Sequence, residues 1–189
     1  VELAQDGFDE VSAELDGGGI KNFGIITLTN TTIDNNTSAN GNGGGVSNIN
    51  QASLVNVTLS GNAAENGLGG GFYHAQYSSS LLNNVTIANN SAGRGAGLYA
   101  IQTGLVIQNS LVVNNPTGSN CGVDTGTVSS MGYNLSDDTS CNLAFNQVSD
   151  QNNVPDAKLR PLANYGGHTE THALKFDSPA IDGGSNTGC

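Results

Sequence analysis

A nine-residue pattern, first seen from Leu28 to Asn36, occurs four times along this chain at a nearly constant interval. Its final asparagine recurs as Asn62, Asn90 and Asn115, in steps of 26, 28 and 25 residues. A second marker, a glycine followed by an apolar residue, recurs every 26 residues, at Gly19-Ile20, Gly45-Val46, Gly71-Phe72 and Gly97-Leu98. A fixed period in the twenties is typical of a solenoid, in which each repeat packs only on its neighbours.

Each repeat carries the signals of short strands separated by sharp turns. Apolar and polar residues alternate in runs such as Ile26-Thr27-Leu28 and Leu105-Val106-Ile107, which is the periodicity of a strand. Clusters rich in glycine and asparagine, such as 40–44 and 66–70, favour turns because these residues tolerate positive φ. Three strands and three turns fit into one repeat. The sequence therefore predicts a parallel β-helix whose coils stack about 4.8 Å apart.

Two columns of asparagine are explained by this geometry. At a sharp bend the backbone cannot satisfy all of its own hydrogen bonds. An asparagine in left-handed conformation makes the bend, and its amide can bond to the equivalent amide one coil away. We therefore predict structural ladders, with ligand binding by these amides as the alternative. One predicted column contains Asn36, Asn62, Asn90 and Asn115, and the other, six residues earlier, contains Asn30, Asn56, Asn84 and Asn109.

Three segments differ in regularity. Residues 1–18 are predicted to be either an incomplete first coil, with Phe8 near the position of Ile33, or a short capping helix, and the incomplete coil is favoured. Residues 19–150 hold the coils, and Asn134, which stands 25 residues after Asn109, predicts a fifth, decorated one. Residues 151–189 contain prolines and glycine pairs, and they predict a non-repeating segment packed on the solenoid.

The net charge limits which classes of partner the protein can bind, and the cysteines indicate the compartment in which it is found. The net charge of −11, from 16 Asp and Glu against 5 Lys and Arg, leaves no basic patch for nucleic acid or an anionic membrane. No apolar run is long enough to span a bilayer, and a chain that starts at Val1 without a signal peptide is expected to be a mature or trimmed product. Cys121 and Cys141 flank one irregular loop, which predicts a disulfide and an oxidising compartment. Cys189 has no obvious partner.

Several motifs resemble those of a bacterial family of surface proteins. The most specific are Gly132-Tyr133-Asn134-Leu135 followed by Cys141, the tail from Leu162 to Leu174, and the stretch from Ser178 to Gly184. Together with the repeat, they resemble a family with right-handed parallel β-helix repeats and a choice-of-anchor Q type C-terminal region. The resemblance covers nearly the whole chain from Gly17.

This resemblance implies a right-handed β-helix, export and display at a cell surface. It also matches Cys121 and Cys141 to the paired cysteines of the family. Two positions depart from the pattern: His168 stands where the family usually has proline, and the chain ends at Cys189, where relatives continue. Because the family has no single established activity, the resemblance implies a fold and a location rather than a reaction.

Few residues are candidates for enzymatic chemistry. A polysaccharide lyase needs a base beside carboxylates, and Arg94 is the only cation between the second and fourth coils, with Glu65 as its expected surface partner. A glycosidase needs two facing carboxylates, and no carboxylate column forms at Asp34 because the next coils have Ser, Ala and Val there. Asp137 and Asp138 predict a solvated turn, with a calcium site as the weaker alternative.

Other residues are candidates for binding. Tyr73, Tyr77 and Tyr99, with Arg94, form the candidate carbohydrate-binding set, while His74 between them is expected at the surface of a strand. A separate column of threonines is expected to point outward, as on ice-binding solenoids, and to break after three coils. A pair of histidines four residues apart would suit zinc on a helix, but its surroundings indicate an extended chain. The threonines are Thr32, Thr58 and Thr86, the column is broken by Leu111, and the histidines are His168 and His172.

We therefore predict an all-β fold, a right-handed parallel β-helix of about five coils of roughly 26 residues with an irregular C-terminal segment. The predicted function is that of an exported, non-enzymatic structural or adhesive protein, extracellular or at a cell surface, that assembles end to end through its unpaired strand edges. The alternatives are a carbohydrate-binding or polysaccharide-degrading β-helix and an ice-binding protein. Expected partners are a second copy or a surface glycan or protein, without nucleic acid, membrane insertion or any cofactor other than calcium.

Overall fold

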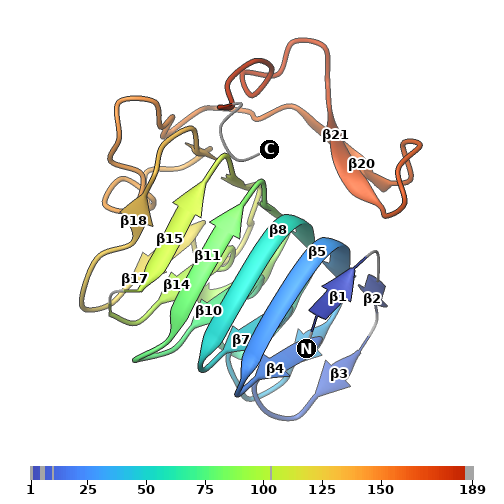
Figure 1. The fold of residues 1–189 in the computed structure, drawn as a ribbon, viewed down its shortest axis with the longest axis vertical. Helices are drawn as coiled ribbons and strands as arrows, with labels where there is room; N and C mark the ends of the chain where they lie inside the picture. Colours follow the sequence, from blue (N-terminus) through green and yellow to red (C-terminus); the bar gives the residue numbers. More distant parts are fainter. Residues whose placement is uncertain (1, 5–6, 10, 103, 186–189) are drawn as a thin grey trace.

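The computed structural model describes residues 2–4, 7–9, 11–102 and 104–185, which form a parallel β-solenoid of about five turns (Figure 1). Three parallel sheets make its walls, and a short antiparallel hairpin lies outside them. No helix is found within these described ranges, so none that could cross a membrane is present there. The predicted fold class is confirmed.

The strands are distributed over four sheets. The large sheet contains β1 (Glu2–Ala4), β2 (Gly7–Asp9), β5 (Ile25–Asp34), β8 (Gln51–Ser60), β11 (Ser79–Asn83), β12 (Thr86–Ala88), β15 (Leu105–Gln108), β16 (Leu111–Val113), β18 (Ser129–Ser130) and β19 (Leu135–Ser136). The four-strand sheet contains β3 (Ser12–Ala13), β6 (Thr37–Ser38), β9 (Ala63–Leu68) and β13 (Ser91–Arg94). The five-strand sheet contains β4 (Ile20–Asn22), β7 (Val46–Asn48), β10 (Phe72–His74), β14 (Leu98–Ala100) and β17 (Cys121–Val123). The hairpin contains β20 (Leu159–Ala163) and β21 (Thr171–Leu174).

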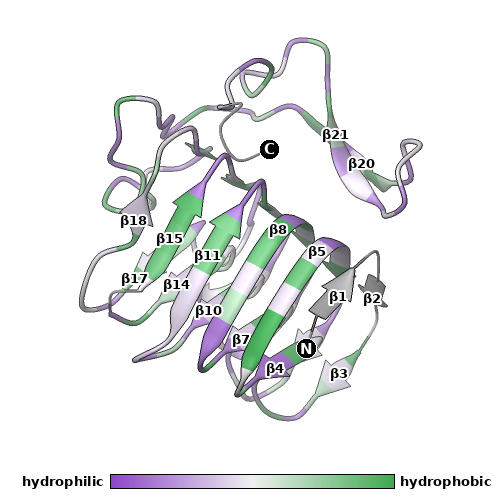
Figure 2. Ribbon diagram, viewed as in Figure 1, coloured by the Kyte–Doolittle hydropathy of each residue, from purple (hydrophilic) through white to green (hydrophobic). Residues whose placement is uncertain are grey.

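The aliphatic columns of the repeat form the core. Leu28 lies in register with Leu54, and the column continues through the next coils to Ile107. The members of this column are completely buried. Outward positions of the same strands are polar or mixed, so the strands are striped in hydropathy (Figure 2). Each of the three sheets buries one apolar face, and burial of these faces against one another forms a single core.

Left-handed residues recur at three equivalent positions in every full coil. Asn30 and Asn56 bend β5 and β8 in their middle, with φ of 51° and 56°, and Asn84 and Asn109 split the next two strands at the same place. A second bend lies one residue before the inner asparagines, at Asn35, Gly61, Asn89 and Asn114, and a third lies at Gly17, Gly43, Gly69 and Gly95. Only glycine and asparagine adopt this conformation at little cost, which explains the composition of the turns.

The prediction for the bends needs one correction. The outer column (Asn30, Asn56, Asn84 and Asn109) is left-handed as predicted, but the inner column (Asn36, Asn62, Asn90 and Asn115) is not. At the inner corner the preceding residue makes the bend. The inner asparagines therefore turn their amides into the solenoid wall, where hydrogen bonding rather than backbone conformation selects them.

The first coil is partial, and the fifth is decorated. Among the described residues before Gly17, β1, β2 and β3 pair with the first full coil, and Phe8 lies opposite Ile33. At the other end a disulfide joins Cys121 to Cys141, with a Cα–Cα distance of 5.0 Å. Phe145 is buried with this disulfide at the end of the core. We call residues 137–157 the end cap, because they cover the last coil.

The C-terminal segment forms an arm alongside the solenoid. We define the arm as residues 158–185, which include the hairpin β20–β21 seen beside β5 and β8 in Figure 1. Its root packs on a small apolar cluster that includes Val113, Leu135 and Ala157. The arm then runs back from the fifth coil toward the first.

Candidate functional site

Hydrogen bonds from the hairpin fix the arm to the outer face of the large sheet. The Thr32 hydroxyl donates a hydrogen bond to the carbonyl oxygen of Glu170 at 2.6 Å, although 138 residues separate the two in sequence. The hydroxyls of Thr58 and Thr171 lie 3.3 Å apart, and Ser60 Oγ lies 2.9 Å from His172 Nε2. Thr32 and Thr58 thus point outward from the core as predicted, but the arm buries both of them. An ice-binding surface cannot be built on this column.

His172 is a structural residue of this contact. Its Nδ1 lies 2.7 Å from the carbonyl oxygen of Arg160, which can only accept, so Nδ1 carries the hydrogen. Nε2 then faces the hydroxyl of Ser60. Both ring nitrogens are thus used within the protein. His168 is exposed on the hairpin loop, and no group of three potential metal-binding side chains exists in the described part of the chain.

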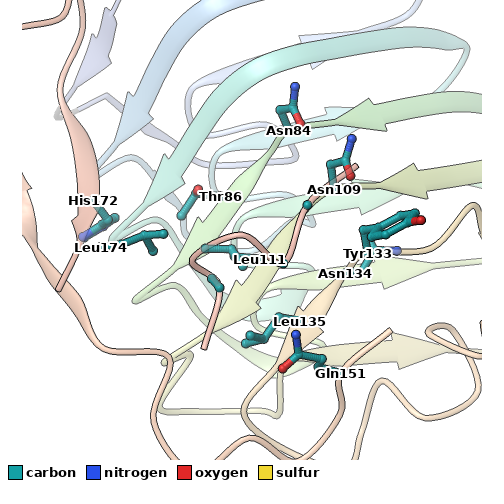
Figure 3. A pocket seen from close by; sticks show the side chains of 13 residues that line it. Asn84, Thr86, Asn109, Leu111, Tyr133, Asn134, Leu135, Gln151, His172 and Leu174 are labelled. Carbon is teal, nitrogen blue, oxygen red and sulfur yellow. The ribbon is translucent and has the colours of Figure 1, made fainter. Parts of the chain in front are cut away.

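A groove runs between the arm and the outer asparagine column. Figure 3 shows the part of it nearest the fifth coil, where His172 and Leu174 of the arm face Thr86 and Leu111 of the solenoid. This depression has a volume of about 260 Å³ and continues into a second one of about 420 Å³. Asn84 and Thr86 line both. The other lining residues are Asn30, Asn56, Val57, Thr58, Asn109, Tyr133, Asn134, Leu135, Gln151, Gly167, His168, Thr169, Thr171, Ala180, Gly183 and Gly184.

The outer asparagines form a ladder of amides along this groove. Asn56 donates to Asn30 at 3.1 Å, and Asn84 donates to Asn56 at 3.2 Å. An amide has two N–H donors and an oxygen with two lone pairs, so these two bonds use one donor and one lone pair of Asn56. The last member of the column, Asn109, bonds elsewhere: its side chain donates to Asn83 at 3.5 Å, and its oxygen accepts the backbone N–H of Ser185 at 2.9 Å. The column therefore presents a regular row of amide groups to the groove.

The inner asparagines are fully engaged. Asn62 Oδ1 accepts from both the backbone N–H and the side chain of Asn36, at 3.0 and 3.1 Å. Asn62 Nδ2 donates to Asn90 Oδ1 at 3.0 Å and to the carbonyl oxygen of Ile33 at 2.9 Å. The pattern repeats at Asn90 and ends at Asn115 on Asn120. No amide capacity is left there for a ligand.

The tyrosine cluster is not an open carbohydrate platform. The rings of Tyr73 and Tyr99 are stacked with centroids 6.2 Å apart, and the Arg94 guanidinium lies 5.3 Å from the Tyr99 ring. Tyr99 is completely buried and Tyr73 nearly so. A sugar cannot stack on buried rings. Tyr77, by contrast, is 85% exposed in a turn.

Charges around this cluster also differ from expectation. Arg94 pairs with Asp124 at 3.6 Å rather than with Glu65. Burial raises the pKa of Tyr99 above its ordinary value, and the neighbouring Asp124 carboxylate adds to the rise. Burial also raises the pKa of Tyr73, with Asp16 and Asp124 contributing. Both phenols therefore stay protonated at neutral pH.

His74 is buried rather than at the surface. It shows no exposed area, and its Nδ1 lies 2.9 Å from the hydroxyl of Ser80. The Ser80 hydroxyl oxygen accepts a hydrogen bond from the Asn48 side-chain amide at 2.9 Å. The Asn48 amide oxygen in turn accepts from the Asn22 side chain at 2.7 Å. A third, shorter polar ladder thus lies at the corner between the five-strand sheet and the large sheet.

Asp137 and Asp138 close the inner ladder instead of forming an open turn. Asp137 accepts the backbone N–H of Asn114 at 2.9 Å and the side chain of Asn120 at 2.5 Å. Asp138 accepts the backbone N–H groups of Asn120 and Ser140, each at 2.9 Å. All four carboxylate oxygens accept hydrogen bonds from the protein. This arrangement ties the last coil to the end cap through hydrogen bonds.

The sequence-based alignment of Asn134 with Asn109 is wrong by one residue. Tyr133 takes the left-handed position that corresponds to Asn109 in the preceding coil, with φ of 62°, because Leu135 pairs with Leu111. Asn134 is therefore displaced by one position, and its oxygen accepts the backbone N–H of Ser110 at 3.0 Å. An alignment on Leu135 rather than on asparagine would have found this register.

Comparisons with protein-family models, curated proteins and solved structures gave no match for this chain. The chain is thus characterised by its own architecture, a parallel β-solenoid of about five turns. The groove where the C-terminal arm crosses the large sheet is one of its surface depressions.

Proposed function

We propose that this β-solenoid is an exported structural or adhesive protein of a cell surface that does not catalyse a reaction. The groove beneath the arm carries this proposal, because it offers amide and hydroxyl groups in a recessed site without the carboxylate pair that glycosidases need. The Cys121–Cys141 disulfide supports an oxidising compartment. The resemblance of the tail, from Leu162 to Gly184, to choice-of-anchor Q regions supports surface display.

The composition of the groove favours an uncharged polymer as its ligand. Among the described residues that line it, none is Asp, Glu, Lys or Arg. Amides such as that of Asn56 can bond to neutral hydroxyls, while Leu111, Leu174 and the ring of Tyr133 offer apolar contact. A neutral polysaccharide combines both kinds of surface. The carbohydrate-binding alternative is thus better supported than the polysaccharide-degrading one.

The proposal is tested by a substitution that blocks the groove where its two depressions meet. Thr86→Trp is expected to weaken binding of neutral polysaccharides by at least about tenfold, because a bulky ring would occupy the shared wall. Thr27→Trp is the matched control, since Thr27 is also a half-buried outward threonine of the large sheet but does not line the groove. Affinity electrophoresis and calorimetry against glucans, mannans and xylans give the readout, and thermal unfolding checks both variants.

Two outcomes would contradict the proposal. Equal binding by the wild type and Thr86→Trp would exclude the groove as the adhesive surface. If the highly purified protein still released reducing or unsaturated sugar ends from a polysaccharide, the chain would be an enzyme.

A further inference from the structure

The few cations of this acidic chain are concentrated on the arm. The whole chain has five Lys and Arg residues and a net charge of −11. Three of the five, Lys158, Arg160 and Lys175, belong to the arm. They lie on or directly beside the paired strands of the hairpin, which brings residues far apart in sequence together.

Two of these three cations are available to an external anion. Lys158 forms an ion pair with Asp177, and this contact holds the pKa of the Asp177 carboxyl below its ordinary value. Within the part of the chain that the structure describes, neither Arg160 nor Lys175 has an ion-pair partner, and both are exposed. The positive charge of Lys175 contributes to the same lowering of the Asp177 pKa, so Arg160 is the cation of the hairpin least engaged with a carboxylate.

Aromatic rings accompany the unpaired cations. Phe176 is 93% exposed and Tyr165 is 42% exposed. The Tyr165 hydroxyl donates to the carbonyl oxygen of Pro161 at 2.8 Å, which fixes the ring against the hairpin. These residues, with Arg160, Pro161, Lys175 and Asp177, line one shallow depression of about 450 Å³ on the arm. The Asp177 carboxylate in it is paired with Lys158, which leaves Arg160 and Lys175 as its two unpaired cations among the described residues. We call this depression the arm patch.

We infer that the arm patch binds a carboxylated polysaccharide, one that contains uronate sugars. The Arg160 guanidinium can hold a carboxylate by two parallel hydrogen bonds. Lys175 adds a second positive charge, and the rings of Tyr165 and Phe176 can lie against the apolar faces of pyranose rings. This inference rests on the proposed adhesive function and deepens it by naming a second ligand class at a separate site.

The charge of the rest of the molecule makes the patch selective. A uronate polymer is repelled by a chain of net charge −11, so contact is favoured only where cations gather. Binding should therefore be weak at high salt, because ions screen exposed charges. The groove under the arm is lined by no Lys or Arg among the described residues and should not take this polymer.

The experiment measures binding of polygalacturonate oligomers by calorimetry at low and high salt. Arg160→Gln and Lys175→Gln are each expected to weaken binding by about tenfold, the effect of losing one charge-assisted contact. Arg94→Gln is the matched control, because it removes the same charge from an exposed arginine outside the arm. It should leave the affinity unchanged, and raising the salt should weaken binding by the wild type.

The inference would be overturned if polygalacturonate did not bind at low salt, or if Arg94→Gln and Arg160→Gln lost the same affinity for it. It would also be overturned if the protein self-associated instead of binding the glycan and Arg160→Gln abolished that self-association. The last result would identify a second, acidic copy of the chain as the occupant. Failure at the arm patch is distinguishable from failure of the proposed groove, because the groove is tested with neutral polysaccharides and Thr86→Trp.

Discussion

Asparagine serves two different purposes in this chain, although the repeat presents both columns in the same way. The outer asparagines supply a left-handed backbone and line the groove with an exposed ladder of amides, as at Asn56. The inner ones are buried and use every donor and acceptor within the wall, as at Asn62. A buried polar group without its partners costs far more than an exposed one. The two columns should therefore differ sharply in their effect on stability.

We predict that Asn62→Ala lowers the free energy of unfolding by about 3 kcal/mol, because it leaves the buried amide of Asn36 and the oxygen of Asn90 without this partner. Asn56→Gly is the matched control: it removes an exposed amide and keeps a residue that tolerates positive φ. The control should cost less than about 1 kcal/mol. Chemical denaturation of both variants provides the comparison, and equal losses would refute the distinction.

The arm is an element whose position depends on a few side-chain contacts. Its hairpin has two strands only, and a two-stranded hairpin is at most marginally stable in water. Contacts such as Ser60 with His172 therefore decide whether it stays on the large sheet. Because the groove exists only while the arm is docked, arm position and ligand binding are coupled.

We predict that Ser60→Ala loosens the arm without disturbing the coils. Loss of about 1 kcal/mol from one buried hydrogen bond corresponds to roughly a fivefold rise in the open population. Hydrogen exchange of amides in 159–174 should speed up by that factor, while exchange in β8 and β11 stays unchanged. Ser53→Ala is the control, since Ser53 lies on β8 outside the arm contacts. Faster exchange throughout the solenoid would contradict this separation.

The two ends of the solenoid are unlike each other. At the last coil, the end cap buries Phe145 and Cys141 against the core and ties β17 to the cap through the disulfide. Repeated end-to-end stacking needs both ends of each subunit to be open. The cap thus disfavours the predicted filament, which stays a prediction until it is tested.

We expect discrete particles in negative-stain electron microscopy across a wide range of protein concentration, with or without calcium. Cys121→Ser with Cys141→Ser should increase association, because it releases the cap and uncovers strand edges that can pair with another chain. Light scattering under reducing conditions provides an independent check on the wild type. Ordered filaments of the wild-type protein would show instead that its ends pair despite the cap.

Much of the fold could be predicted from the sequence because a solenoid is nearly one-dimensional. Each coil contacts the coil about 26 residues away, so the spacing of Leu28, Leu54 and Leu82 already contains the register of the strands. Glycine and asparagine mark the bends for a local, conformational reason. The repeat was therefore sufficient to predict both the length of a coil and the residues that form the buried columns.

The candidate sites were decided by tertiary structure. The contact between Thr32 and Glu170 spans 138 residues and belongs to no repeat, so no periodic signal could reveal that the arm covers the threonines. The burial of Tyr99 depends on the side chains that happen to lie beside it in the stacked coils, among them Tyr73 and Arg94. Periodicity specifies which residues stack upon one another; it contains no information about which non-repeating segment lies across the stack.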